Sequence, residues 1–196
     1  SIIRDGVAEM ELSDFAGAIP DHSFDYIIFE ACFMAGIEVA WELRHKTPYI
    51  LASSPEIVHP GYTPVYLQSA HKIIEANIRG FGQDVFNYTL TYAESDPQRS
   101  ATYSVICTER LPALASFISE HCDFSAPFRL QDIQHFDRNR YRLCFDFEED
   151  YSRLLVDPSK RTAFTPLVAA AIPWTASTDA FMTQMGGGNG FEIRQH

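Results

Sequence analysis

The stretch FDYIIFEACFMAGIEVAWELR, residues 24–44, decides the fold because it joins a strand pattern to a helix pattern. Residues 25–31 form a short, nearly continuous apolar run, which is typical of a strand covered on both faces. Residues 34–46 then show helical spacing of apolar side chains, and Pro48 ends that pattern. The next segment, residues 49–54, indicates a second buried strand. A strand, a helix and a strand within about thirty residues form a βαβ unit, so we predict a parallel sheet.

The rest of the chain contains further helix and strand patterns. We expect helices at residues 9–19 and 64–79, a strand at residues 101–107, and a late strand in the apolar run at residues 165–174. Gly80 and Gly82 interrupt the pattern. We therefore divide the chain into residues 1–80, the C-terminal part of a catalytic core, and residues 81–196, a smaller mixed α/β subdomain.

Composition places the chain among globular proteins and argues against two kinds of partner. Of its 196 residues, 46% are hydrophobic and 21% are charged, and the net charge is −11. A duplex-binding surface needs clustered Lys and Arg, and the sequence shows no such cluster, so we expect no nucleic-acid partner. No apolar run reaches the roughly 18 residues that a membrane helix requires, so we expect no membrane span in this chain.

Cys32 differs from the other three cysteines in its surroundings. No two cysteines form a CxxC pair, which argues against zinc, and a disulfide among Cys107, Cys122 and Cys144 stays open. Cys32 falls where the predicted strand ends and the predicted helix begins. Ligands bind at the carboxyl ends of parallel strands, and a helix N-terminus stabilises a thiolate. Cys32 is thus a candidate nucleophile; the alternative is a small, buried and inert side chain.

Glu30 strengthens the functional interpretation of Cys32. Side chains alternate along a strand, so residues 30 and 32 should share one face. A carboxylate inside a buried strand costs several kcal/mol if it is left unpaired. We therefore expect a cation to meet Glu30, either an Arg or Lys of the protein itself or the basic side chain of a substrate.

These residues resemble the nucleophile region of the clostripain-like cysteine peptidases, clan relatives of caspases, legumain and gingipains. That family has an apolar strand ending in Asp-Ala-Cys, followed by Met, a small residue and Glu-Val-Ala-Tyr-Glu-Leu. The resemblance covers residues 24–66. The matching positions here are Ala31, Cys32, Met34, Glu38, Val39, Ala40, Glu42 and Leu43, and then Tyr49, Ile50, Ala52 and Ser53 in the next strand.

The resemblance implies a fold and an activity. The fold would be a caspase-like α/β fold, with a mainly parallel sheet flanked by helices. Cys32 would be the nucleophile of an endopeptidase that cleaves after Arg or Lys. The family's acidic residue two positions before the Cys forms the base of the S1 pocket; here it is Glu30 rather than Asp, which would make the pocket shallower. Ser54 and Glu56 follow the second strand and are candidates for lining the same pocket, or else a turn cap and a solvated loop carboxylate.

A Cys–His dyad also needs a histidine, which the family supplies before the Cys in a His-Gly step. This chain has no His-Gly. Of its seven histidines, His59 follows the second strand and could approach the site; the others are His22, His45, His71, His121, His135 and His196. Clostripain-like zymogens are cut, often by themselves, between the His strand and the Cys strand. We therefore expect that Ser1 is not the translated start and that an N-terminal light chain of the same precursor supplies the His.

Two functions remain open from the sequence. The first is a cysteine endopeptidase, activated by self-processing, that acts on peptides or proteins with a basic residue before the cleaved bond. The second is a catalytically inactive caspase-like module that binds peptides or acts as a scaffold.

The resemblance also bears on export and metal binding. It implies a bacterial product that is secreted, periplasmic or held at the cell surface. We expect no dedicated metal site. Calcium is the one candidate cofactor, because clostripain itself is associated with calcium and residues 146–150, DFEED, gather four acids. Those acids lack the EF-hand spacing and also favour the start of a helix.

Overall fold

The computed structural model describes residues 3–5, 8–57, 60–91, 101–127, 129, 132–136, 144–181 and 191–192. The helices are α1 (Leu12–Ala18), α2 (Ile37–Glu42), α3 (Thr63–Ile74), α4 (Ile78–Thr91), the 3₁₀ turn η1 (Thr108–Arg110), α5 (Leu111–His121), α6 (Phe147–Leu154) and α7 (Pro158–Ala171). The strands are β1 (Ile3–Asp5), β2 (Ala8–Met10), β3 (Ile27–Ile28), β4 (Tyr49–Ala52), β5 (Thr102–Cys107), β6 (Trp174–Ser177), β7 (Ala180–Phe181) and β8 (Phe191–Glu192).

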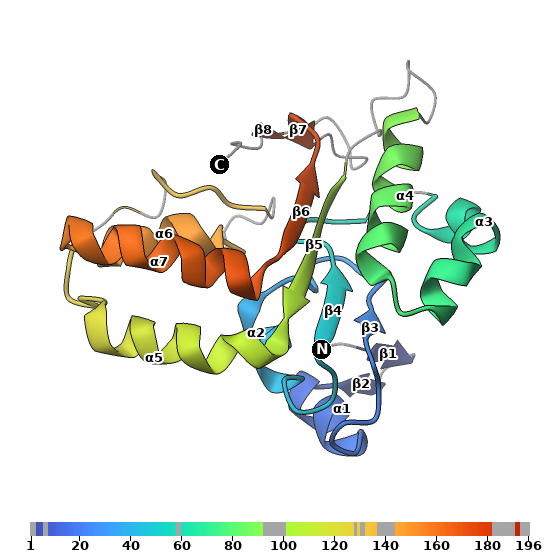
Figure 1. Cartoon of the computed structure of the whole chain (residues 1–196), viewed down its shortest axis with the longest axis horizontal. Helices are drawn as coiled ribbons and strands as arrows, with labels where there is room; N and C mark the ends of the chain where they lie inside the picture. The colour runs from blue at the N-terminus through green and yellow to red at the C-terminus, as the bar shows by residue number, and fades with distance from the viewer. Residues whose placement is uncertain are drawn as a thin grey trace.

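A four-stranded sheet in the order β3-β4-β5-β6 forms the centre of the molecule. Figure 1 shows α5, α6 and α7 on one side of these strands and α3 and α4 on the other. The predicted α/β fold with helices on both faces of a sheet is therefore confirmed. The two-stranded antiparallel pairs β1–β2 and β7–β8 are separate from this sheet.

The sheet is mixed rather than mainly parallel. The predicted βαβ unit is present: β3 and β4 pair in parallel, with Ile27 opposite Ile50, and α2 connects them. The pairs β4–β5 and β5–β6, however, are antiparallel. A single βαβ unit does not determine the direction of the strands that follow it. Here β4 and β5 are joined through two helices, α3 and α4.

Alternation along the central strands creates two hydrophobic cores. Ile50 and Ala52 of β4 face the core formed with α1, α2, α5 and α7, whereas Leu51 faces the core formed with α3 and α4. In β5, Ile106 joins the first core and Val105 joins the second. Period-two alternation with apolar residues on both faces explains why these strands are nearly continuous hydrophobic runs.

Gly80 and Gly82 lie inside α4, so they do not interrupt the structure as their spacing suggested. A Cβ atom on Gly82 would come within 2.9 Å of the Trp174 ring and 3.0 Å of Leu51 Cδ1. Glycine at position 82 thus lets α4 approach the sheet closely. The sheet takes β3 and β4 from residues 1–80 and β5 and β6 from residues 81–196, so both proposed parts contribute to it.

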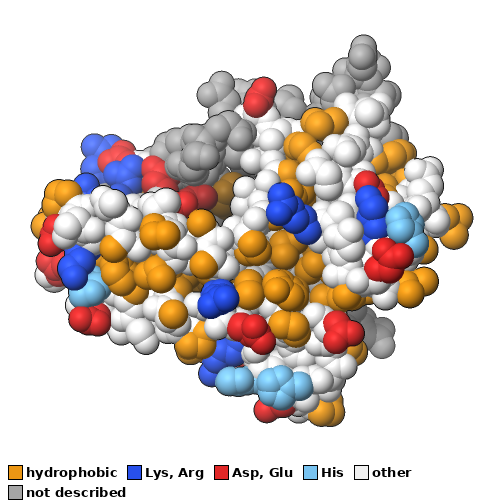
Figure 2. Space-filling view, in the orientation of Figure 1, with side chains coloured by type: hydrophobic (Ala, Val, Ile, Leu, Met, Phe, Trp, Pro, Cys, Tyr) orange, Lys and Arg blue, Asp and Glu red, His pale blue; other side chains and the backbone are white. Residues whose placement is uncertain are grey.

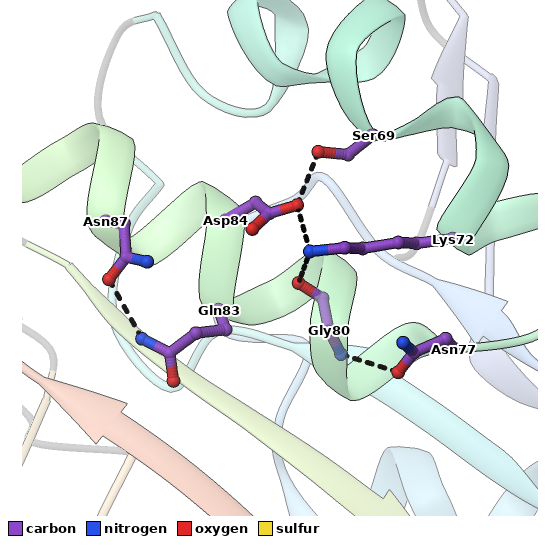
Figure 3. Close-up of polar contacts among 7 residues, drawn as sticks. All are labelled: Ser69, Lys72, Asn77, Gly80, Gln83, Asp84 and Asn87. Carbon is purple, nitrogen blue, oxygen red and sulfur yellow. Dashed lines mark hydrogen bonds and ion pairs between the residues drawn. The ribbon is translucent and has the colours of Figure 1, made fainter.

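Polar side chains fasten α3 to α4 (Figure 3). Asp84 Oδ2 accepts hydrogen bonds from Ser69 Oγ at 2.5 Å and Lys72 Nζ at 2.6 Å. Burial raises the pKa of the Asp84 carboxyl, but the bonds from Lys72 and Ser69 outweigh burial and hold it below the ordinary value of 3.8. At the start of α4, the Gly80 N–H donates to Asn77 Oδ1 at 2.9 Å. This cluster fixes α3, which carries part of the candidate site.

The apolar run at residues 165–174 is mostly helical, so the predicted late strand is wrong. It belongs to α7, which buries Phe164, Val168 and Ala171 at helical spacing, and the strand β6 begins only at Trp174. No helix within the described residues has the length and hydropathy needed to cross a membrane.

Candidate active site

Cys32 lies in a turn between β3 and α2. The parallel pairing of β3 continues to the hydrogen bond from the Phe29 N–H to the Leu51 carbonyl, at 2.9 Å, and residues 31–35 then form turns. Helix α2 begins only at Ile37, because Gly36 is its N-cap and has an extended ψ of 140°. The prediction that Cys32 lies at a helix N-terminus is therefore wrong, and strand alternation also ends before it.

Two backbone hydrogen bonds hold this turn against the segment that follows β4. The Phe33 N–H donates to the Pro55 carbonyl at 3.1 Å, and the Ala35 N–H donates to the Ser53 carbonyl at 3.0 Å. Phe33 has a φ of 61°, which is uncommon for a bulky side chain and persists where the surroundings enforce it. The strained turn presents Cys32 at the carboxyl end of β3.

The thiol of Cys32 is exposed and has a backbone donor. Its Sγ atom accepts a hydrogen bond from the Ile57 N–H at 3.3 Å. The other three cysteines are also free thiols; Cys107 is buried, and Cys122 and Cys144 are partly buried. The Ile57 N–H is thus a backbone donor that points at the Cys32 sulfur. An exposed sulfur with such a donor fits a nucleophile better than an inert core side chain.

Glu30 is held by neutral donors rather than by a cation. Its Oε1 accepts from the Tyr62 N–H at 2.6 Å, and its Oε2 accepts from the Tyr66 hydroxyl at 2.8 Å. The side chain is exposed, so the expected cost of full burial does not arise. Within the described part of the chain, no Lys or Arg side chain forms an ion pair with Glu30. Among the described residues, the partners of Glu30 are therefore uncharged hydrogen-bond donors.

Gly61 makes the approach of Glu30 possible. Its φ is +66°, and a Cβ atom at this position would lie 2.3 Å from Glu30 Oε1. The next residue, Tyr62, is fully buried, with ring centroids 6.0 Å from Phe81 and 5.5 Å from Tyr103. The buried ring anchors the backbone N–H that binds Glu30.

The tyrosines around Glu30 stay protonated at neutral pH. Burial, together with the hydrogen bond to Glu30, raises the pKa of Tyr66 to about 12. Burial also raises the pKa of Tyr103 to about 12, although a hydrogen bond with Thr89 works in the opposite direction. The pKa of Tyr62 is raised further, mainly by burial. Tyr66 therefore acts as a hydrogen-bond donor to the carboxylate.

Ser54 and Glu56 lie beside the site, after β4. Both side chains are partly buried, and Glu56 immediately precedes Ile57, whose N–H donates to Cys32 Sγ.

The direct contacts to Cys32 and Glu30 come from residues that the sequence analysis did not select: Ile57, Gly61, Tyr62 and Tyr66. A signal was present, because Tyr62 and Tyr66 are one helical turn apart and follow a loop glycine.

No histidine in the described ranges forms a hydrogen bond with Cys32 Sγ. The His22 N–H donates to the His45 carbonyl at 2.8 Å, next to the start of β3 and away from Cys32. His71 is exposed on α3, and His121 on α5 packs against the Phe117 ring at 4.6 Å. His59 falls outside the described residues. The described residues thus contain a candidate nucleophile and a carboxylate, and none of their histidines is hydrogen-bonded to the thiol.

Two of the acids in residues 146–150, Asp146 and Glu149, take structural roles in α6. Asp146 Oδ1 accepts from the Glu149 N–H at 2.8 Å as an N-cap, and Glu149 pairs with Arg153 at 2.8 Å. Over the described residues, no group of three or more His, Cys, Asp or Glu side chains is arranged to hold a metal ion.

The fold of the chain is similar to that of several solved cysteine protease structures. A clostripain from Bacteroides thetaiotaomicron ATCC 29148 in complex with the peptide inhibitor BTN-VLTK-AOMK is 20% identical; the match has a TM-score of 0.83 and covers 97% of this chain and 84% of that chain. A secreted C11 cysteine protease from Bacteroides thetaiotaomicron is 21% identical, with a TM-score of 0.80 over 95% of this chain and 52% of that chain.

An inactive zymogen C11 protease from Parabacteroides distasonis is 22% identical, with a TM-score of 0.71 over 94% of this chain and 53% of that chain. At these identities the likeness shows the fold, which is the caspase-like α/β fold that the resemblance implied. The chain spans about half the length of the last two proteins.

The family assignment comes from the sequence. No curated protein sequence matches the chain significantly. The model of the clostripain family, however, matches residues 4–122, which is more than half of the chain and includes the β3–α2–β4 unit, Glu30 and Cys32. The chain therefore belongs to the clostripain family of cysteine peptidases.

Proposed function

We propose that this chain carries the nucleophile and the substrate-recognition acid of an endopeptidase that cleaves after Arg or Lys. One observation carries the proposal. The exposed Cys32 thiol and the Glu30 carboxylate, which pairs with no Lys or Arg of the described residues, are two positions apart in the sequence; Cys32 accepts from Ile57, and Glu30 accepts from Tyr62 and Tyr66. If Glu30 binds the side chain of a substrate Lys or Arg, the backbone carbonyl group of that substrate residue would lie near Cys32.

The reaction follows from a thiolate nucleophile. Cys32 Sγ bonds to the carbonyl carbon, and the electron pair of the C=O bond moves to oxygen, where backbone N–H groups stabilise the oxyanion. The oxyanion collapses, the C–N bond breaks, and the leaving amine takes a proton from the histidine. Water then gives a proton to that histidine and attacks the acyl-thioester; the C–S bond breaks, which releases the carboxylic acid product and restores the thiolate beside the protonated histidine.

The histidine comes, in this proposal, from the N-terminal light chain of the same precursor. Strand β3 is at the edge of the sheet, and within the described residues no strand pairs with its outer side. An exposed edge is a template for a further strand. Hydrophobic side chains also gather in the middle of the face shown in Figure 2, between α5 and the α3–α4 pair. Activation by processing agrees with the inactive zymogen form of the Parabacteroides protease.

We further propose that the protein is exported. One similar protein is a secreted protease. Secretion, the periplasm and the cell surface all give an exported peptidase access to protein substrates. A calcium requirement stays a prediction of the family resemblance.

The test uses the full-length precursor and fluorogenic peptides that end in a Lys or Arg amide. We expect cleavage by the wild-type protein and none by Cys32→Ala. We expect His59→Ala to keep the activity, because the general base lies in the light chain. Equal cleavage by wild type and Cys32→Ala would refute the Cys32 assignment. Binding of basic peptides without any cleavage would favour the inactive, peptide-binding module.

A further inference from the structure

The hydrogen bond between Tyr66 and Glu30 joins two parts of the fold. Glu30 follows β3, whereas Tyr66 lies on the first turns of α3, 36 residues later. The carboxylate is exposed, and an exposed glutamate samples several rotamers unless other groups hold it. The Tyr62 N–H fixes Oε1 and the Tyr66 hydroxyl fixes Oε2, so the two donors together define where the carboxylate points.

Tyr66 is itself held in place. Its ring stacks on Phe81 with centroids 5.6 Å apart and an interplanar angle of 23°. Helix α3 is fastened to α4 through Ser69, Lys72 and Asp84, and the Tyr26 hydroxyl donates to the Ile73 carbonyl near the end of α3. The Tyr66 hydroxyl therefore has a defined position independently of Glu30.

Gly61 makes room for this arrangement. Gly61 adopts a left-handed conformation, and its missing Cβ leaves the space that Glu30 Oε1 occupies. Because the pKa of Tyr66 is about 12, its hydroxyl keeps its proton and donates over the whole pH range of a peptidase assay. Both features favour a carboxylate that is held in one orientation.

We propose that Tyr66 is a specificity-determining positioning residue, whose hydroxyl holds the Glu30 carboxylate where it receives the basic side chain of the substrate. The inference rests on the proposed function and deepens it. Tyr66 acts through Glu30 and does not touch the reacting carbonyl. It should therefore affect the preference for a basic residue more than the reactivity of Cys32.

Tyr66→Phe tests the proposal in the processed enzyme, since phenylalanine keeps the stacking on Phe81 and removes only the hydroxyl. A hydrogen bond to a charged group is typically worth about tenfold or more in an equilibrium constant. We expect kcat/KM for Lys and Arg peptides to fall about tenfold, mainly through KM. The kcat/KM for neutral peptides that end in norleucine or citrulline should be unchanged. The rate at which iodoacetamide alkylates Cys32 should also be unchanged.

Two further variants make the test specific. Gly61→Ala should reproduce the selective loss, because its Cβ would displace the Glu30 carboxylate. Tyr49→Phe, a matched change at an exposed tyrosine on β4, should have no effect. An unchanged ratio between basic and neutral peptides in Tyr66→Phe would overturn the positioning role while leaving the peptidase intact. A wild-type enzyme that shows no preference for basic peptides would overturn the proposed specificity and this inference together.

Discussion

The backbone N–H of Ile57 donates a 3.3 Å hydrogen bond to the Sγ atom of Cys32, across 25 residues of sequence. The donor lies in the segment after β4, and the acceptor lies in the strained turn after β3. The parallel pairing of these two strands brings their carboxyl ends together, so the contact follows from the βαβ topology. The sequence analysis expected a helix N-terminus beside Cys32, but the backbone donor at the sulfur is the Ile57 N–H.

Replacing Ile57 with proline should make Cys32 less reactive, because proline has no N–H to donate. We expect alkylation of Cys32 to slow by roughly threefold to tenfold, which corresponds to one hydrogen bond. Peptide mapping after iodoacetamide treatment measures this rate separately from the rates at the other cysteines. Ile57→Val keeps the N–H and is the control. Equal alkylation rates in Ile57→Pro and wild type, with both proteins folded, would show that the N–H does not matter.

The sequence predicted the β3–α2–β4 unit well because its signals are local. Apolar runs, helical spacing and Pro48 lie within one stretch, and the clostripain family model matches across it. The donors to Glu30 could not be found in this way, since Tyr62 and Tyr66 lie 32 and 36 residues farther along the chain. Only the packing of α3 against the rest of the fold brings them to the carboxylate.

Two errors in the fold prediction have tertiary causes. Gly82 appeared to break a helix, but close packing of α4 against Trp174 and Leu51 requires the absence of a side chain there. The run at residues 165–174 looked like a strand because it is almost wholly apolar. The buried set Phe164, Val168 and Ala171 follows helical spacing, which length and periodicity together could have detected.

Gly82→Ala should destabilise the protein although alanine is a better helix former than glycine. The propensity gain is about 1 kcal/mol, whereas forcing a methyl group into a packed site typically costs about 1–3 kcal/mol. The new Cβ would meet the Trp174 ring at 2.9 Å. We expect a net loss of about 1 kcal/mol in the free energy of unfolding, measured by urea denaturation.

Gly17→Ala provides the matched control, because a Cβ on this α1 glycine has no neighbour within 4 Å. We expect this variant to gain roughly 0.5 kcal/mol in stability from helix propensity. The close-packing account of Gly82 fails if both variants shift the denaturation midpoint in the same direction.

The Asp84 cluster should make stability depend on pH in the acid range. The pKa of Asp84 in the folded protein is below 3.8, so its ionised form is favoured by folding. This contribution is fully present above pH 3.8 and is lost as the pH falls through the folded pKa. Asp84→Asn should cost about 1 kcal/mol at pH 7, since the Lys72–Asp84 pair is partly exposed. The difference between wild type and variant should shrink below pH 3.8.

Urea denaturation at pH 7 and at pH 2.5 measures both differences, and Lys72→Met serves as the partner variant in a double-mutant cycle. Coupling between positions 72 and 84 should be present at pH 7 and weaker in acid. A difference between wild type and Asp84→Asn that stays the same at both pH values would rule out titration of Asp84 as the cause.

The charge of the Glu30 side chain and its length should have separate effects on substrate specificity. Glu30→Gln keeps the shape but removes the charge, and its amide N–H₂ would face one of the two donors, Tyr62 N–H or Tyr66 hydroxyl. We expect kcat/KM for Lys and Arg peptides to fall at least about tenfold, because the charged hydrogen bond between the substrate's basic side chain and the carboxylate is lost.

Glu30→Asp keeps the charge but shortens the side chain by one methylene, so the carboxylate no longer reaches the Tyr62 N–H and the Tyr66 hydroxyl. That variant should prefer basic peptides over norleucine peptides less strongly than wild type, as expected for Tyr66→Phe, and should discriminate less between Lys and Arg, because the carboxylate is then less rigidly held. Kinetics with the three peptides in parallel distinguish the cases, and a Glu30→Gln enzyme that still prefers basic peptides as strongly as wild type would remove Glu30 from substrate recognition.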